Sequence, residues 1–132
     1  SKESAMSSNP SNKPFFLKVE SSQIDWGGHA NDLPYIISEF KEFSLAINSA
    51  IKYAKNDKNT LVVVTADHET GGLAIKKGNL KKNSVSGDFT TIGHSGSMVP
   101  VFSYGTNSEI FSGIYDNTAI YHKFKTAVNQ TN

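Results

Sequence analysis

The sequence contains no cysteine, and this absence limits the chemistry that the chain can carry. Disulfide bonds and thiolate metal sites are excluded, so any transition metal must be bound by histidine, aspartate or glutamate. A chain without cysteine is compatible with an exported bacterial protein but does not require one.

The sequence also lacks an excess of charge of either sign, because 13 lysines and arginines face 12 aspartates and glutamates. This balance gives no electrostatic signature of a nucleic-acid or anionic-membrane partner. A run of about 18 apolar residues, as a transmembrane helix requires, is missing. Residues 1–12 lack the basic and then apolar pattern of a signal peptide, and the chain does not begin with Met. We therefore expect a piece of a longer protein.

The 132 residues are enough for one ordinary domain with its own core. Residues 1–14 are rich in Ser, Asn, Lys and Pro, which predicts a loop or disordered segment. Residues 15–132 are expected to form a single α/β domain.

Three segments predict a strand, a helix and a second strand in succession. Residues 15–20 are mostly apolar and predict a buried strand. Residues 35–55 carry apolar side chains on one helical face. Residues 61–66 are apolar without alternation, which is typical of a strand covered on both faces of a parallel sheet. The order strand, helix, strand predicts a βαβ unit.

The other segments are shorter and more polar. Residues 21–32 contain two adjacent glycines and predict a loop. Residues 71–76 and 99–104 predict strands, and the lysine-rich stretch 77–87 between them predicts a solvated surface loop. Residues 116–128 predict a final helix with Asp116 or Asn117 as its N-cap.

Histidines and carboxylates gather at the predicted strand ends and in one glycine-flanked turn. Glu20 ends the first strand, and Asp67 and His68 end the second. In open α/β sheets, sites form beyond the carboxyl ends of the strands. A further set lies in the loops: Asp25, His29 and, between glycines, His94.

The residue types suit metal ions. Asp25, His29 and His94 offer two imidazoles and one carboxylate, the kind of set that binds a catalytic zinc ion and leaves one position open. Asp67 and His68 would supply half of a second site, provided that the strand breaks into a turn there, because neighbouring strand residues point to opposite faces. A carboxylate such as that of Glu20 suits Mg²⁺.

Other polar residues have simpler interpretations. A lone Asp or His at a strand end is most often a cap or a satisfied polar group, so the argument depends on the three clusters together. His122 lies in the last predicted helix, and a surface or packing role is expected for it. Turn or capping roles are expected for Asp32, Asp57, Asp88 and Asp116.

Three motifs resemble the alkaline phosphatase family. Residues 15–29 follow the pattern F-F-L-x-V-E-x-x-x-I-D-x-x-x-H, and residues 65–72 read T-A-D-H-E-T-G-G. Residues 93–105 follow G-H-[ST]-G and then V-P-V-x-x-Y-G. The motifs occur in the family's order, and the resemblance extends from about residue 14 to the C-terminus. It implies a fragment of a three-layer fold, with a central, mostly parallel sheet flanked by helices.

The resemblance also implies roles for single residues. Asp25, His29 and His94 match the ligands of a first zinc ion. Asp67 and His68 match ligands of a second zinc ion, Glu20 matches a magnesium ligand, and Trp26 matches a position that shapes the phosphate pocket. In the family, phosphate monoesters of many kinds are hydrolysed through a phosphorylated serine with the help of the metal ions. Family members in bacteria act outside the cytoplasm, in the periplasm or after secretion.

The sequence departs from the family by what it does not contain. The nucleophilic serine of a D-S-A segment, two further metal ligands and the phosphate-binding arginine belong upstream of these motifs. Ser95 and Ser97 fall inside the His94 motif and are not expected to replace the nucleophile. Only the first zinc site is complete, so we expect the isolated chain to be inactive.

The missing strands also predict that the chain associates. Residues 62–64 would leave an unpaired apolar sheet edge, which favours a dimer, a domain swap or a rearranged small sheet. Two other functions stay open: a phosphodiesterase or mutase of the same superfamily, and a metal-binding module without catalytic activity.

Overall fold

The computed structural model describes residues 14–129. The predicted N-terminal loop at residues 1–14 therefore lies almost entirely outside the described residues. By internal contacts the chain divides into two compact units. One unit contains residues 14–16, 45–67 and 100–129, and the other contains residues 17–44 and 68–99.

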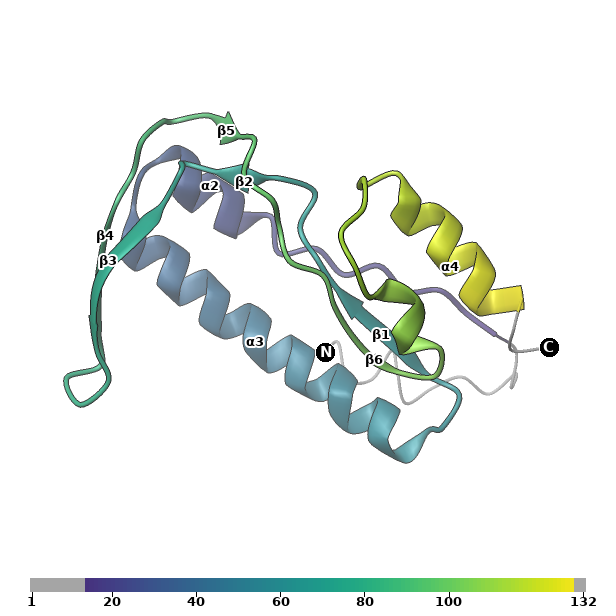
Figure 1. Cartoon of the computed structure of the whole chain (residues 1–132). Helices are drawn as coiled ribbons and strands as arrows, with labels where there is room; N and C mark the ends of the chain where they lie inside the picture. Colours follow the sequence, from purple (N-terminus) through teal and green to yellow (C-terminus); the bar gives the residue numbers. More distant parts are fainter. Residues whose placement is uncertain (1–13, 130–132) are drawn as a thin grey trace. The chain divides into compact units, whose positions relative to one another are not determined.

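The longest element is helix α3, Leu33–Asn56, which confirms the helix predicted at residues 35–55 (Figure 1). It begins where the Asp32 side chain accepts a hydrogen bond from the Tyr35 N–H at 3.0 Å, the geometry of a helix cap. Ala54 on its apolar face is buried, whereas Phe40 is 58 % exposed. The predicted apolar face is therefore covered only in part.

The first unit contains a two-stranded sheet and two short helices. Strand β1, Leu61–Val64, pairs antiparallel with β6, Phe102–Gly105, and Leu61 lies opposite Gly105. A 3₁₀ turn, η1 at Ser108–Phe111, and helix α4, Ala119–Asn129, follow. The rings of Phe111 and Phe124 meet edge to face, with centroids 5.0 Å apart.

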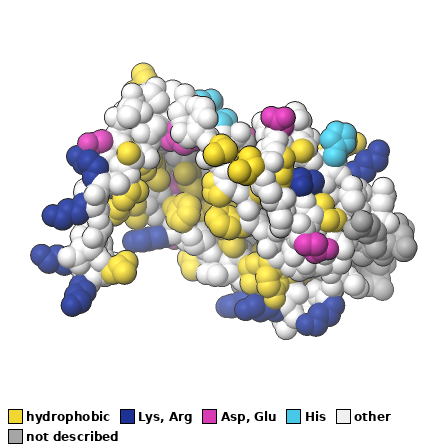
Figure 2. All heavy atoms as spheres, viewed as in Figure 1, with side chains coloured by type: hydrophobic (Ala, Val, Ile, Leu, Met, Phe, Trp, Pro, Cys, Tyr) yellow, Lys and Arg dark blue, Asp and Glu magenta, His cyan; other side chains and the backbone are white. Residues whose placement is uncertain are grey.

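The second unit contains helix α2, Gln23–His29, the start of α3, and two antiparallel ladders (Figure 1). Strand β2, Glu69–Thr70, pairs with β5, His94–Ser95. Strand β3, Ala74–Asn79, pairs with β4, Ser84–Asp88, to form an exposed hairpin. Dark blue lysine side chains line this hairpin in Figure 2, as expected for a solvated lysine-rich segment.

Several expected elements differ from the structure. Residues 15–20 form no strand, and the segment expected to be a loop at 21–32 contains α2. The residues expected to be a loop at 77–87 belong largely to the β3–β4 hairpin. The last helix begins at Ala119, after a turn in which the Asp116 carbonyl accepts from the Ala119 N–H at 2.9 Å. Asp116 therefore takes part in the turn before the helix and does not cap it.

The sheets differ from the expected parallel arrangement. All strand pairs among residues 14–129 are antiparallel and involve only two strands each. Every residue of β1 is half-buried, although its unbroken apolar sequence is typical of a strand covered on both faces. The sequence of β1 therefore suits a more covered environment than the described residues provide.

Little apolar surface is buried. Among the described residues, only Ala54, Phe111 and Ala127 are buried hydrophobics. Large apolar side chains stay exposed on many elements, and hydrophobic side chains form several yellow patches on the face seen in Figure 2. The most exposed are Leu80, Ile114, Met98, Ile92 and Phe16. No helix in the described part of the chain is long and apolar enough to cross a membrane.

Candidate metal centre

Two adjacent glycines let helix α2 pack closely against its neighbours. A Cβ atom on Gly27 would lie 2.9 Å from the Ile36 side chain, and one on Gly28 would lie 2.9 Å from the Thr70 carbonyl oxygen. These glycines predict a loop by local propensity, yet both are buried inside a helix because only a residue without a side chain fits there. The close packing brings α2 beside strand β2.

Helix α2 places Asp25 and His29 on one face, because residues four apart in a helix are neighbours. Strand β5 supplies His94. One ligand atom from each of these three residues lies within 4.8 Å of the others, and they form the one group of this kind among the described residues. The structure therefore brings together the three residues that the sequence assigns to the first metal site.

The distances within the cluster suit a tetrahedral ion. His29 Nε2 lies 3.5 Å from one carboxylate oxygen of Asp25, and His94 Nε2 lies 3.8 Å from the other. Ligands about 2.0–2.2 Å from a tetrahedral zinc ion are about 3.4 Å apart. Small adjustments of partly exposed side chains would close the difference.

The His29 ring is oriented by a backbone carbonyl. Its Nδ1 lies 2.6 Å from the carbonyl oxygen of Ile92, which can only accept a hydrogen bond. The neutral ring therefore carries its proton on Nδ1, and in that tautomer the lone pair of Nε2 faces Asp25. Metal-binding histidines commonly have this outer partner, which fixes both the tautomer and the ring orientation.

Thr70 links the Asp25 carboxylate to a fourth polar side chain, His68. Its hydroxyl donates to Asp25 Oδ1 at 2.5 Å and lies 3.2 Å from His68 Nδ1. A hydroxyl that donates its one proton to Asp25 can only accept from His68. Nδ1 of His68 then carries the proton, and its Nε2 is left as the ring's acceptor. The His68 ring stacks on His94 with centroids 3.6 Å apart.

Glu69 holds the turn that follows strand β2. Its carboxylate accepts the Gly72 N–H at 3.0 Å, the Leu73 N–H at 3.2 Å and the Ser95 hydroxyl. The Ser95 hydroxyl lowers the pKa of Glu69 below its ordinary value. Burial opposes the shift, and the backbone N–H groups of Leu73 and Gly72 add to it.

The remaining residues assigned from the sequence lie outside this cluster. Glu20 is exposed and pairs with Lys18, with 3.3 Å between Nζ and the carboxylate. Trp26 lies on α2 and is 59 % exposed. Asp67 belongs to the other unit and is exposed. His122 lies on the exposed side of α4 beside the ring of Tyr121, which agrees with the surface role expected for it.

The polar residues expected in turns and caps have the following partners. Asp32 caps α3, and Asp57 accepts the Asn59 N–H at 3.1 Å in the turn after that helix. Asp88 differs, since it ends strand β4 and pairs with Lys76 at 2.6 Å. No metal role is indicated for any of these carboxylates.

Sequence reasoning missed the groups that hold the ligands in place. Glu69 and Ser95 each lie next to a predicted ligand in the chain, and Thr70 follows Glu69. Their hydrogen bonds depend on the β2–β5 pairing and on the packing of α2 beside β2. The sequence does contain one signal, the Gly71-Gly72 pair, which predicts a tight turn. In the structure both glycines have positive φ, 90° and 58°.

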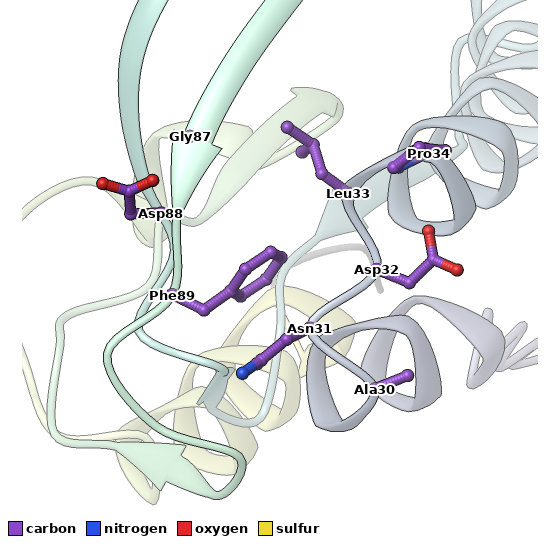
Figure 3. Close-up of a pocket in the computed structure, with 8 residues that line it drawn as sticks. All are labelled: Ala30, Asn31, Asp32, Leu33, Pro34, Gly87, Asp88 and Phe89. Atoms are coloured by element: carbon purple, nitrogen blue, oxygen red, sulfur yellow. The ribbon is translucent and has the colours of Figure 1, made fainter.

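An open hollow lies elsewhere in the second unit and shares no residue with the cluster. It is lined by residues 30–34 and by Gly87, Asp88 and Phe89 (Figure 3). The carboxylates at its edge are already engaged, Asp32 with the Tyr35 N–H and Asp88 with Lys76. The hollow therefore offers no free charged group for a ligand.

Comparison with known proteins shows what the chain is similar to. The family model described as "Alkaline phosphatase" matches residues 3–87. Alkaline phosphatase 3 of Bacillus subtilis is 33 % identical over 176 aligned positions, which cover 80 % of this chain and 38 % of the relative. Alkaline phosphatase 4 of the same organism is 55 % identical over 67 residues, or 51 % of this chain and 14 % of the relative.

Solved structures give the same result. A variant of the alkaline phosphatase from the Antarctic bacterium TAB5, solved with Mg bound in its M3 site, superposes with a TM-score of 0.86. It is 43 % identical in sequence, and the match covers 97 % of this chain and 40 % of that one. This chain thus spans about two fifths of the length of such relatives. The family model and these relatives together show that the chain belongs to the alkaline phosphatase family.

Proposed function

We propose that this chain supplies the metal-ligand part of an enzyme that hydrolyses phosphate monoesters at alkaline pH. The observation that carries the proposal is the convergence of Asp25, His29 and His94, with His29 Nδ1 held by a backbone carbonyl and both Nε2 atoms facing the carboxylate. A bound zinc ion would act there as a Lewis acid on phosphate oxygens. The membership in the alkaline phosphatase family supports the reaction type.

The other metal assignments follow the same proposal. Asp67 and His68 would contribute to a second zinc site, and the acceptor Nε2 of His68 is consistent with that role. Glu20 would contribute to a magnesium site, since its carboxylate is exposed and its ion pair with Lys18 lies at the surface. Trp26 would line the pocket for the phosphate group. The remaining ligands of these sites would come from residues beyond this sequence.

The nucleophile is also proposed to lie outside these 132 residues. Ser95 is the serine next to the cluster, but its hydroxyl donates to Glu69. The chain spans only about two fifths of its relatives, which leaves room for the serine and the phosphate-binding arginine elsewhere. We therefore expect the isolated chain to be inactive, and the complete enzyme to form a phosphorylated serine.

The three-layer fold with a parallel sheet belongs to this proposal as well. Strand β1 is bonded on one edge only, to β6, among the described residues. An added parallel strand would pair with its second edge and cover valines that are now half-buried. Alone, the chain is expected to associate through this edge, as a homodimer or larger assembly. We further propose an extracytoplasmic location, periplasmic or secreted.

Two other functions remain to be separated from this one. A phosphodiesterase or mutase with the same metal ligands would prefer a different substrate, and a metal-binding module would bind zinc without turnover. The functional site, and not the fold, decides between them. The T-A-D-H-E-T-G-G and G-H-S-G segments favour the phosphatase.

The test compares this chain alone with a chimaera in which it replaces the aligned two fifths of the TAB5 alkaline phosphatase. Turnover of a chromogenic phosphate monoester is measured with Zn²⁺ and Mg²⁺ at alkaline pH. We expect activity only in the chimaera, lost in His94→Ala and kept in His122→Ala. A folded chimaera that binds zinc without turnover would favour the metal-binding module. Turnover by the chain alone would show that the nucleophile lies within it.

A further inference from the structure

The Glu69 carboxylate and the Ser95 hydroxyl form a contact that no step of the proposed reaction uses. Glu69 and Ser95 are cross-strand partners in the β2–β5 ladder, and the next pair along the ladder is Thr70 with His94. The pair that contacts the cluster is therefore adjacent to the pair joined by the Glu69–Ser95 hydrogen bond. The ladder has only these two residue pairs, so few backbone bonds hold it.

Glu69 also stabilises the turn that follows strand β2. Its two carboxylate oxygens accept the N–H groups of Gly72 and Leu73, and the Gly71 carbonyl accepts from Thr90 and Thr91. The Gly71 N–H donates in turn to the Gly93 carbonyl at 2.9 Å, one residue before His94. One carboxylate thus stabilises both the turn after β2 and, through Ser95, the segment that carries His94.

The Ser95 hydroxyl contacts both Glu69 and Ser97. Its hydroxyl donates to Glu69, and its oxygen lies 3.4 Å from the Ser97 N–H and 3.2 Å from the Ser97 hydroxyl. Both Glu69 and Ser95 are half-buried, whereas His94 itself is exposed. The His94 ring stacks on His68, but the orientation of an exposed ligand on a two-residue strand also depends on neighbours that hold its backbone.

We propose that Glu69 and Ser95 are positioning residues that hold His94 in place for metal binding. This inference rests on the proposed metal site, and it adds a role to two residues that contact no metal themselves. The carboxylate–hydroxyl contact ties β5 to β2, so that His94 Nε2 stays beside Asp25. Without it, the His94 segment would sample more conformations, and the ion would lose one preoriented ligand.

The role differs from that of a nucleophile and its base, which a serine beside a carboxylate would also suggest. The Glu69 oxygens are shared with two backbone N–H groups, which weakens them as proton acceptors. A structural tether also tolerates threonine in place of serine, because only the hydroxyl is required. The experiment below separates the two roles.

The test measures Co²⁺ binding by the 132-residue chain through the visible absorption of the bound ion, and Zn²⁺ affinity by competition with a chelating dye. Ser95→Ala and Glu69→Ala are each expected to weaken Zn²⁺ binding by about 10-fold, the lower end of the range for outer partners of metal ligands. The Co²⁺ absorption should weaken as the coordination geometry loosens. Ser95→Thr should restore both, and Ser86→Ala, in the exposed hairpin, should change neither.

A double-variant cycle shows whether the two residues act through their contact. Glu69→Ala combined with Ser95→Ala should cost little more than the worse single variant, because each removes the same tether. Far-UV circular dichroism identifies variants that lose the fold, and if Glu69→Ala is among them the isosteric Glu69→Gln variant carries the comparison.

The outcomes distinguish this inference from the proposed function. Zn²⁺ binding that is unchanged in Ser95→Ala and Glu69→Ala, but lost in His94→Ala, would overturn the positioning role and keep the metal site. Absence of saturable binding by the unaltered chain would overturn the positioning role and a self-sufficient metal site in this chain, whereas turnover by the chimaera tests the proposed reaction separately. Phosphate-ester turnover by the chain alone, abolished in Ser95→Ala, would replace the tether with a nucleophile.

Discussion

The hydroxyl of Thr70 donates a hydrogen bond of 2.5 Å to the carboxylate of Asp25, across 45 residues of sequence. Hydrogen bonds to a charged acceptor are shorter and stronger than neutral ones. This bond fixes Oδ1 of Asp25, the oxygen that faces His94, and leaves Oδ2 directed at His29. The helix that carries Asp25 and the strand that carries Thr70 are thereby held together at the metal cluster.

The Thr70–Asp25 bond predicts a loss of metal affinity in Thr70→Val, which keeps the shape and removes the hydroxyl. We expect Zn²⁺ affinity to fall by about 10-fold or more, as for other outer partners of metal ligands. Thr70→Ser should recover most of the affinity. Thr126→Val is the matched control, because the Thr126 hydroxyl donates to the His122 carbonyl within α4. Equal affinity in Thr70→Val and the unaltered chain would show that the bond has no role in metal binding.

The histidines of the chain provide a second comparison. His94→Ala removes a proposed ligand, and its cost in Zn²⁺ affinity should exceed the 10- to 100-fold typical of outer partners. His122→Ala removes an imidazole of the same type on exposed α4 and should leave affinity unchanged. Isothermal titration with Zn²⁺ measures both. Comparable losses in the two variants would mean that binding is nonspecific and that His94 is not a ligand.

The long helix could be predicted from the sequence because its apolar spacing depends on residues near one another in the chain. Asp25, His29 and His94 were proposed as ligands from their residue types, and among them only the Asp25-x-x-x-His29 spacing is local. Helix α2 was missed because Gly27 and Gly28 have poor helix propensity, while the packing against Ile36 and Thr70 that requires them is a tertiary effect.

The sheet was harder to predict for a related reason. Residues 61–64 are all apolar, as in a parallel strand that is covered on both faces. The described residues offer β1 only β6, which arrives from the opposite direction. The pairing of a strand depends on which segments are present to meet it, and this cannot be read from the strand itself. Contacts such as Glu69 with Ser95 depend in the same way on the β2–β5 pairing, and they were missed for the same reason.

The glycines of α2 predict a steric effect on stability. In Gly28→Ala, the added methyl group would lie 2.9 Å from the Thr70 carbonyl oxygen, a backbone atom that cannot rotate away. We expect a loss of about 1–3 kcal/mol in the free energy of unfolding, as for other overpacked sites. Gly78→Ala in the hairpin is the control, because its methyl group would meet only the Ser84 carbonyl at 3.9 Å. Urea denaturation that gives equal midpoints for both variants would contradict the close packing of α2.

The turn after α3 predicts a pH-dependent contribution to stability. The Thr60 hydroxyl donates to the Asp57 carboxylate at 2.5 Å and is the main cause of a lowered pKa for that group; the Asn59 N–H adds to it and burial opposes it. A carboxylate whose pKa is lower in the folded than in the unfolded chain stabilises the fold above its ordinary pKa of about 3.9. This contribution is lost as the pH falls through the lowered value.

Asp57→Asn should therefore lower the thermal midpoint slightly at pH 7 and have a smaller effect at pH 2, because the stabilising charge of the unaltered chain is lost as the pH falls through the lowered pKa. The effect is small because Asp57 lies in a solvated turn. Thr60→Val should also make the thermal midpoint depend less on pH in the acid range, since it removes the principal hydrogen-bond donor to Asp57. Asp116→Asn, in the turn before α4, serves as the control, because there the backbone carbonyl accepts the hydrogen bond. The contradicting outcome is a thermal midpoint that Asp57→Asn lowers by the same amount at pH 7 and at pH 2. It would show that the ionised carboxylate contributes nothing.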